Sequence, residues 1–317
     1  MNLLIIWLIR RVLMLVPILL GISIAIFLIM QLIPGDVVSG ILGIEETPEL
    51  RAMWEKKLGI DRPLVTQYLS WIGGVVRGDF GESFRTGAKV FPEILWRFSI
   101  SAELAILACV VAWLIAFPLG ILSALKRNSV IDRNVRVLAL LGVSVPGFAF
   151  ATLLILFMAL VFGYYPPIKY VSLLENPLKN LEIMIFPAIV LGSSMAGSVM
   201  RMTRSSLLEV LRQDFIKAVR ATGAPERVTI MRHAFRNASI PIVTLVGMQI
   251  GILMGGTVVI EQIFSIPGLG QYLLTGIFQR DFPIVQGTVL FMAVIYVLIN
   301  LLVDILYTYI DPRITYS

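Results

Sequence analysis

Six long stretches of the chain contain no charged residue and no histidine, and each is long enough to cross a membrane. A helix needs about 20 apolar residues to cross a hydrocarbon core of about 30 Å. A helix also satisfies its own backbone hydrogen bonds in lipid, whereas a barrel would show short alternating segments. The pattern therefore predicts an all-α integral membrane protein with six transmembrane helices. These stretches are residues 12–35, 104–125, 137–168, 183–200, 237–260 and 282–303.

Two uncharged stretches do not fit a single straight span. The third of the six would reach about 48 Å as one helix, so we expect Pro146-Gly147 to break it near one end and Pro166-Pro167 to end it. A seventh stretch, 262–279, carries one proline and three glycines. We predict that it forms a hairpin with a short helix, re-entrant or on the membrane surface, because irregular backbone is tolerated at membrane depth only where protein or water covers it.

The segment between the first two spans is predicted to be a folded, helical external loop. Thr47 provides a capping hydroxyl, Pro48 occupies the first helical position and Gly59 ends the helix. Pro63 then opens a second apolar and polar stretch over 64–76. The loop fits either a cap packed on the outer mouth of the protein or a docking surface for an external partner.

The loop 201–236 is strongly basic, yet it carries apolar residues at helical spacing from Leu207 to Val219. Gly223 interrupts the pattern, and Pro225 restarts a helix after it. We therefore predict a helix, a glycine hinge and a second helix. The pattern alone leaves open whether a cytoplasmic partner or an anionic membrane surface covers the apolar faces.

Composition supports the membrane assignment and excludes several classes of protein. Hydrophobic residues make up 58% and charged residues 15% of the 317 residues, against about 45–50% and about 25% in soluble domains. The only cysteine, Cys109, cannot form an intramolecular disulfide, and the only histidine, His233, leaves no cluster for zinc. A soluble enzyme, a disulfide scaffold and a zinc protein are therefore disfavoured.

The distribution of lysine and arginine predicts the orientation. With six spans, one side carries 15 basic and 6 acidic residues and includes both termini and the loop 201–236, whereas the other side carries 11 basic and 14 acidic residues. Basic residues accumulate on the cytoplasmic side. Both termini are therefore predicted to be cytoplasmic, and the net charge of +6 reflects topology rather than nucleic-acid binding.

The chain lacks the motifs of an energy source or an enzyme. It contains no phosphate-binding loop and no serine or zinc hydrolase motif. The spans hold no ionisable acid, base or histidine, which argues against proton or sodium coupling. Among their polar residues, Ser144, Gln249 and Thr257 are candidates for lining a pathway, although most such residues join helices. The pattern favours a passive conduit moved by a cytoplasmic partner over a secondary transporter, a membrane-embedded enzyme or a non-transporting scaffold.

The stretch from Asp214 to Gly223 resembles the cytoplasmic loop motif of bacterial binding-protein-dependent ABC transporter permeases. Lys217-Ala218-Val219 stands in the Glu-Ala-Ala position, and Pro241 is the closing proline after a longer gap than usual. Both departures resemble the dipeptide, oligopeptide and nickel branch. Further segments that resemble this branch occur in order along the chain, at 33–36, 58–63, 78–81, 201–205, 263–270, 280–283, 300–304 and 311–313.

The resemblance implies a type I ABC importer permease in the bacterial inner membrane. It implies a second homologous permease subunit, two ABC ATPase subunits that bind ATP and magnesium, and an external solute-binding protein. This chain would bind no cofactor or metal and would touch membrane lipid but no nucleic acid. It also implies a division into 1–94 (an interfacial N-terminal helix, the first span and the external loop), a permease core at 95–306 and a cytoplasmic tail at 307–317. The residues implied to contact the ATPase are Asp214, Lys217, Ala218, Ala221, Gly223, Ala224 and Glu226.

Overall fold

The computed structural model describes residues 2–32, 37–42, 46–167 and 169–310. The predicted motif at 33–36 and the end of the chain at 311–317 lie outside these residues. Within them the secondary structure is helical, and the only β contact is an isolated bridge between Glu82 and Lys89. The predicted all-α fold is confirmed. The described chain divides into two compact units. Among the described residues, unit 1 comprises those within 2–101 and 267–297, and unit 2 comprises those within 102–266 and 298–310.

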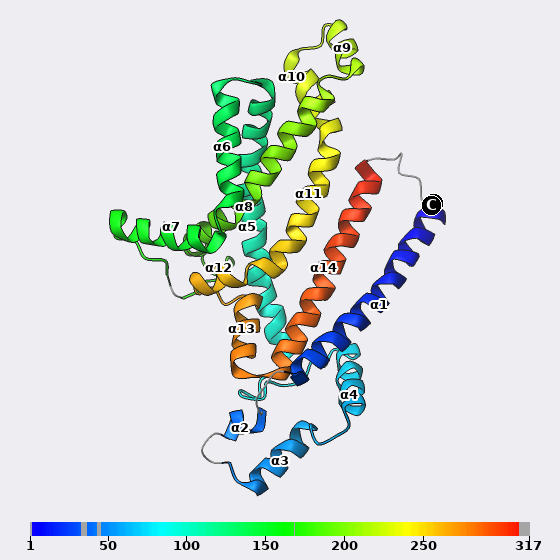
Figure 1. The fold of residues 1–317 in the computed structure, drawn as a ribbon, viewed down its shortest axis with the longest axis vertical. Helices are drawn as coiled ribbons and strands as arrows, with labels where there is room; N and C mark the ends of the chain where they lie inside the picture. Colours follow the sequence, from blue (N-terminus) through cyan, green and yellow to red (C-terminus); the bar gives the residue numbers. More distant parts are fainter. Residues whose placement is uncertain (1, 33–36, 43–45, 168, 311–317) are drawn as a thin grey trace. The chain divides into compact units, whose positions relative to one another are not determined.

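Unit 1 contains the N-terminal helices, the start of α5 and the helices that precede the C-terminus (Figure 1). α1 is one continuous helix that includes Arg10 and Arg11, and its apolar part begins at Leu13. No helix break therefore separates an interfacial segment from the first span, and the membrane position of residues 2–12 stays a prediction. The helices are α1 (Asn2–Leu32), α2 (Val37–Leu42), α3 (Pro48–Leu58), α4 (Leu64–Val76), the first part of α5 (Val90–Leu125), α13 (Leu269–Gln279) and most of α14 (Phe282–Ile310).

The two predicted helices of the loop after α1 form within the predicted limits. The Thr47 hydroxyl accepts a hydrogen bond from the Leu50 N–H at 3.3 Å, and Gly59 ends α3 with a φ of 70°. α4 follows Pro63 and packs on α1, where the hydroxyls of Ser23 and Tyr68 are 2.8 Å apart. The loop therefore contains ordered helices, one of which is attached to the first span.

The chain after α4 is held to the corner between α13 and α14. The buried Asp281 carboxylate accepts a hydrogen bond from the Ser83 hydroxyl at 2.6 Å. The backbone N–H of Leu269, at the start of α13, donates to the Ser101 hydroxyl at 2.8 Å. α13 has 11 residues, too few to cross a bilayer. The short helix predicted within 262–279 is thus confirmed.

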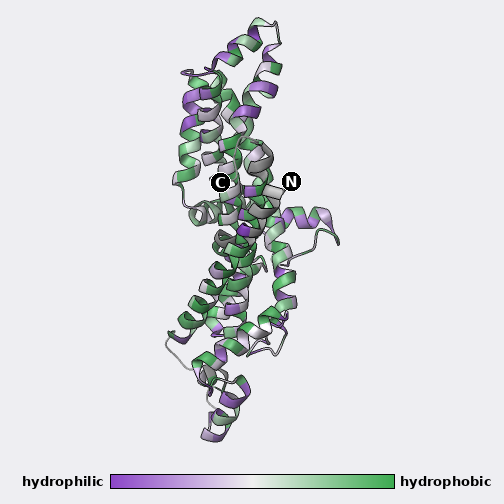
Figure 2. Ribbon diagram, turned by 90° about the vertical axis from the view of Figure 1, so that its right-hand side faces the viewer, coloured by the Kyte–Doolittle hydropathy of each residue, from purple (hydrophilic) through white to green (hydrophobic). Residues whose placement is uncertain are grey.

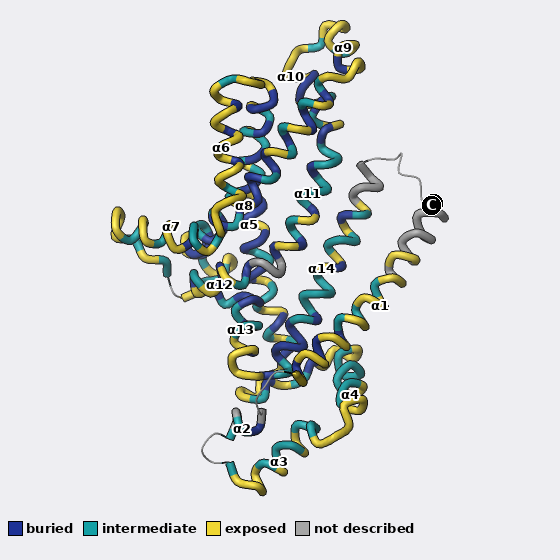
Figure 3. Tube along the Cα trace, viewed as in Figure 1, coloured by how far each residue is buried: buried dark blue, intermediate teal, exposed yellow. Residues whose placement is uncertain are grey.

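Unit 2 is built around α8, which has the most extensively buried surface (Figure 3). Glycines let neighbouring backbones approach it closely. A methyl group on Gly192 would lie 2.7 Å from the Ala108 carbonyl oxygen of α5, and one on Gly197 would lie 2.6 Å from the Ala139 carbonyl oxygen of α6. The helices of unit 2 are residues 102–125 of α5, α6 (Val130–Ser144), α7 (Gly147–Phe162), α8 (Pro177–Val210), α9 (Asp214–Ala221), α10 (Glu226–Val228), the π-helix η2 (Thr229–Ala234), α11 (Phe235–Gly256), α12 (Val258–Ile263) and the end of α14.

The third predicted span is divided where the sequence predicts a break. The break at Pro146 divides it into two helices of similar length, α6 and α7, which are bent by 103°. Proline cannot donate the helical hydrogen bond and holds the preceding residue in an extended conformation, and Val145 has φ −80° and ψ 121°. The predicted break at Pro146-Gly147 is thus confirmed. Because α6 begins at Val130, before the uncharged stretch, the break lies in the middle of the helical segment, and α7 ends at Phe162, before Pro166-Pro167.

Five described helices are long and apolar enough to cross a membrane, and α6 with α7 passes the same test as a bent pair. Figure 2 shows these helices as largely hydrophobic. The fifth uncharged stretch, 237–260, is not one helix, since α11 breaks at Thr257 before α12. α5 and α8 extend beyond their uncharged stretches: α5 begins at Val90, and α8 runs from Pro177 to Val210. Charged residues at span ends therefore do not end the helices.

Candidate coupling site

α9 is a short helix that follows directly from the end of α8. The backbone N–H of Leu211 still bonds to the Leu207 carbonyl oxygen, and the chain then turns over residues 211–213. Asp214 begins α9 and lies at its positive end. Its carboxylate is 2.8 Å from the Lys217 ammonium, an exposed pair that contributes little stability. α9 is thus one eight-residue helix joined to α8 by a tight turn.

Ile216 is the one buried residue of α9. Ile216 has no exposed surface. The opposite face of α9 is exposed and includes Phe215, Ala218 and Ala221. Burial of one isoleucine side chain contributes about 1.5–3 kcal/mol, enough to hold a short helix in place while leaving one face free. The cluster around Ile216 consists of Ala124, Leu207, Val210, Ala234 and Ala238.

The turn after α9 depends on Gly223. Its φ is 78°, and a Cβ at this position would meet no atom within 4 Å. The requirement for glycine is therefore conformational rather than steric. Arg220 donates across the turn to the Glu226 carboxylate, with N–O distances of 2.6 and 3.1 Å, and these bonds raise the pKa of Arg220 further. The angle between α9 and α10 is thus set by one backbone conformation and one exposed ion pair.

The seven predicted coupling residues lie in one continuous helix–turn–helix. Asp214, Lys217, Ala218, Ala221, Gly223 and Glu226 are exposed and Ala224 is half-buried. The chain after the turn is anchored by Thr229, which is buried and whose hydroxyl donates to the Pro225 carbonyl oxygen at 3.3 Å. The sequence did not predict that a π-helix would follow, from Thr229 to Ala234. Residues 214–226 are therefore mostly exposed, whereas Ile216 and Thr229 are buried.

The predicted pathway residues do not lie together. A hollow of about 390 Å³ within unit 2 is lined by Gln249, Ser194 and Ser198 among mostly apolar side chains. The Gln249 Oε1 atom is buried and has no hydrogen-bond partner in the described part of the chain. Ser144 is exposed and Thr257 is buried, and neither lines the hollow. Their assignment to a pathway stays a prediction.

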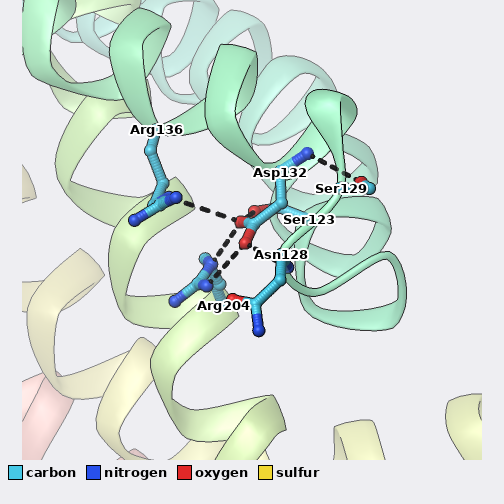
Figure 4. A network of polar contacts seen from close by, with 6 residues as sticks. All are labelled: Ser123, Asn128, Ser129, Asp132, Arg136 and Arg204. Atoms are coloured by element: carbon cyan, nitrogen blue, oxygen red, sulfur yellow. Dashed lines mark hydrogen bonds and ion pairs between the residues drawn. The ribbon is translucent and has the colours of Figure 1, made fainter.

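A buried carboxylate that the sequence did not single out joins α6 to α8 (Figure 4). Asp132 has no exposed surface, and the Arg204 guanidinium donates to both of its oxygens at 2.7 and 2.9 Å. The one signal in the sequence is Ser129 three residues before Asp132, a pattern typical of a helix start. The Ser129 hydroxyl indeed accepts from the Asp132 N–H at 3.2 Å. The partner 72 residues away could not be read from this pattern.

Among the described residues, no three or more acidic, histidine or cysteine side chains are placed to hold a metal ion. The fold and the site together define a multi-pass membrane subunit that displays a short anchored helix outside its spans.

The chain belongs to the family described as binding-protein-dependent transport system inner membrane component. The family model matches residues 116–316, and a model of the N-terminal part of such membrane components matches residues 4–105. The chain is 41% identical over 308 residues to a putative peptide transport system permease protein of Brucella abortus (strain 2308), and the match covers 97% of this chain and 98% of the relative. It is 38% identical over 337 residues to the dipeptide transport system permease protein DppB of Escherichia coli (strain K12), covering 98% and 99%.

A solved structure confirms the fold. An inward-facing form of the MetNI methionine ABC transporter matches with a TM-score of 0.56 and 17% identity, covering 69% of this chain and 96% of that chain. The predicted type I ABC importer permease fold is therefore confirmed, and the chain is a permease subunit of a binding-protein-dependent importer in the inner membrane.

Proposed function

We propose that this chain is one of two permease subunits around a shared pathway and that α9 seats on a separate ATPase subunit. Two ATPase subunits would bind ATP and magnesium, and this chain would hold neither. An external solute-binding protein would deliver the cargo, which we propose to be a peptide or a related small solute because the similar permeases carry peptide-transport names.

The observation that carries this proposal is the geometry of α9. One face is held by Ile216, and the other is exposed and includes the small residues Ala218 and Ala221. Ala218 and Ala221 allow close approach to a partner surface. A helix that is fixed at its base and free at its face can receive a contact and transmit its displacement to α8.

The proposed orientation places both termini and α9 in the cytoplasm. The basic residues on that side support it. ATP binding would draw the two ATPase subunits together and move the seated helices with them. The spans would then shift from inward-open to outward-open. A change in the ratio of outward-open to inward-open transporter from 1:99 to 99:1 requires about 5.5 kcal/mol of differential binding. ATP binding can supply this free energy to the spans only if α9 stays attached to both the ATPase subunit and α8.

The hollow lined by Gln249 supports a pathway of neutral polar groups. We propose that Gln249 contributes to that pathway and that Ser144 and Thr257 do so elsewhere along it. Selectivity for cargo would then rest mainly with the binding protein, since the predicted spans carry no ionisable acid, base or histidine.

A test combines sidedness with co-purification. In a Cys109→Ala background, Arg212→Cys and Met53→Cys each provide one exposed thiol, next to α9 and on α3 respectively. In intact cells stripped of any outer membrane, a membrane-impermeant maleimide should label Met53→Cys and should reach Arg212→Cys only after permeabilisation. The tagged chain should also co-purify with an ATPase subunit.

The reverse labelling pattern would contradict the orientation, and a purified transporter without any ATPase would contradict the proposed coupling. Uptake that continues without ATP and collapses when ion gradients are dissipated would indicate a secondary transporter instead.

A further inference from the structure

The buried Asp132 carboxylate accepts hydrogen bonds from three residues. Besides the two bonds from Arg204, its oxygens accept from the Ser123 hydroxyl at 2.6 Å and from the Asn128 N–H at 2.9 Å. Arg136 lies further out, with its Nε 3.7 Å from the carboxylate. These groups come from the end of α5, the α5–α6 turn, the first turns of α6 and the C-terminal part of α8 (Figure 4).

A buried ion pair of this kind specifies geometry more than it adds stability. Taking both charges out of water costs several kcal/mol per ion, and the attraction repays this only when the remaining hydrogen bonds are made. The Asp132 network makes them, and it holds Asn128 at a φ of 63°, which is uncommon outside glycine. The arrangement therefore selects one relative position of α6 and α8.

The pair is one of two clamps between these helices. The other is the close approach at Gly142 and Gly197, where an added methyl group would meet the facing backbone at 2.9 and 2.6 Å. Gly142 lies ten residues after Asp132, or about 15 Å along α6. Gly120 of α5 packs against Thr203, the residue before Arg204 on α8. Two helices fixed at two separate heights cannot slide or tilt against each other without breaking one clamp.

The position of the pair connects it to the coupling site. Arg204 lies six residues before Val210, the last residue of α8, and α9 follows after the turn. Val210 and Ala124, at the end of α5, belong to the cluster that buries Ile216. The same end of the helix group thus holds both the ion pair and the anchor of α9.

We propose that the Asp132–Arg204 pair locks residues 102–125 of α5, α6 and α8 into one body that moves with α9. Asp132 is then a positioning residue for ATP-driven transport, although it touches neither cargo nor ATPase. The inference rests on the proposed coupling role of α9, which the experiment tests separately.

The first test measures uptake and ATP hydrolysis in the assembled transporter with the variants Asp132→Asn/Arg204→Gln and Arg204→Lys. The double variant leaves no unpaired buried charge, so the protein should fold and retain basal ATP hydrolysis. Loss of the lock should lower cargo transported per ATP by about tenfold. Arg204→Lys keeps the charge but not the bidentate contact. Its cargo transported per ATP should lie between that of the unmodified chain and that of the double variant. Arg201→Gln, at an exposed arginine one turn earlier on α8, should behave as the unmodified chain.

The second test measures rigidity directly. In the Cys109→Ala background, spin labels at Asn134→Cys on α6 and Arg212→Cys after α8 occupy exposed positions. Their distance distribution should stay narrow and unchanged between nucleotide-free and nucleotide-bound transporter, and it should broaden in Asp132→Asn/Arg204→Gln.

A distance between the labels at 134 and 212 that changes with nucleotide, in a chain that keeps Asp132 and Arg204, would overturn the proposal. So would a double variant with normal transport per ATP, or one whose uptake and ATP hydrolysis fall in proportion, since the latter indicates only lost folded protein. Gly223→Val, measured in parallel, separates the two proposals. If that variant transports normally, the coupling role of α9 fails, whereas the label distances still decide whether the lock exists.

Discussion

Replacing Gly223 with valine should reduce cargo uptake by about tenfold while leaving membrane insertion unchanged. The φ of 78° at this position costs a non-glycine residue roughly 1–2 kcal/mol, and about 1.4 kcal/mol corresponds to a factor of ten. The turn would then favour another conformation, and α9 would leave its orientation toward α10. The measurement is ATP-dependent uptake by the reconstituted transporter, with ATP hydrolysis recorded in the same sample.

The matched control is Gly223→Asn, because asparagine tolerates a positive φ better than other side chains. A Cβ at this position meets nothing within 4 Å, so the two variants differ in backbone preference rather than in collisions. Gly223→Asn should therefore keep most of the uptake. Equal uptake by the valine variant and the unmodified chain would show that this turn does not set the coupling geometry.

Replacing Gly197 with valine should prevent normal packing of α6 on α8. Even a methyl group would lie 2.6 Å from the Ala139 carbonyl oxygen, and that backbone cannot move aside as the end of a side chain could. Overpacking typically costs about 1–3 kcal/mol and occasionally more. We expect a lower yield of folded protein and a lower midpoint of thermal unfolding in detergent, followed by tryptophan fluorescence.

Gly21→Ala provides the control within a membrane helix. Gly21 lies in α1, and a Cβ there would meet no atom within 4 Å. Alanine is also the better helix former by about 1 kcal/mol. This variant should unfold at the same temperature as the unmodified chain or slightly higher. An unfolding midpoint for Gly197→Val equal to that of Gly21→Ala would contradict the close packing of α6 and α8.

The sequence predicted best those elements whose limits are encoded locally. Thr47 and Gly59 delimit α3, and Pro63 precedes α4. Gly223 was predicted as a hinge because a glycine followed by proline two residues later ends one helix and begins another. In each case the signal is a capping or turn requirement that depends on a few neighbouring residues. The hinge at Gly223 was predictable for the same reason, but the turn at 211–213, which divides the helix predicted from Leu207 to Val219 into the end of α8 and α9, was not.

Features that depend on tertiary contacts were not predictable. The uncharged stretch that ends at Met200 is shorter than α8. The helix continues to Val210, and Leu207 and Val210 pack in the cluster that contains Ile216. The 103° bend between α6 and α7 could be placed at Pro146 but not given a size. The burial of Asp132 could not be predicted, because it depends on Arg204 in a helix that is distant in the sequence.

We propose that the exposed face of α9 contacts an ATPase subunit. The most direct measurement places a photo-crosslinking amino acid at Ala221, on that face, in the assembled transporter, with the same amino acid at Met53 on α3 as the control. Position 221 should form an adduct with an ATPase subunit, and position 53 should form none. The absence of this adduct in an intact, ATP-hydrolysing complex, or capture of the external binding protein by position 221, would show that α9 does not contact the ATPase.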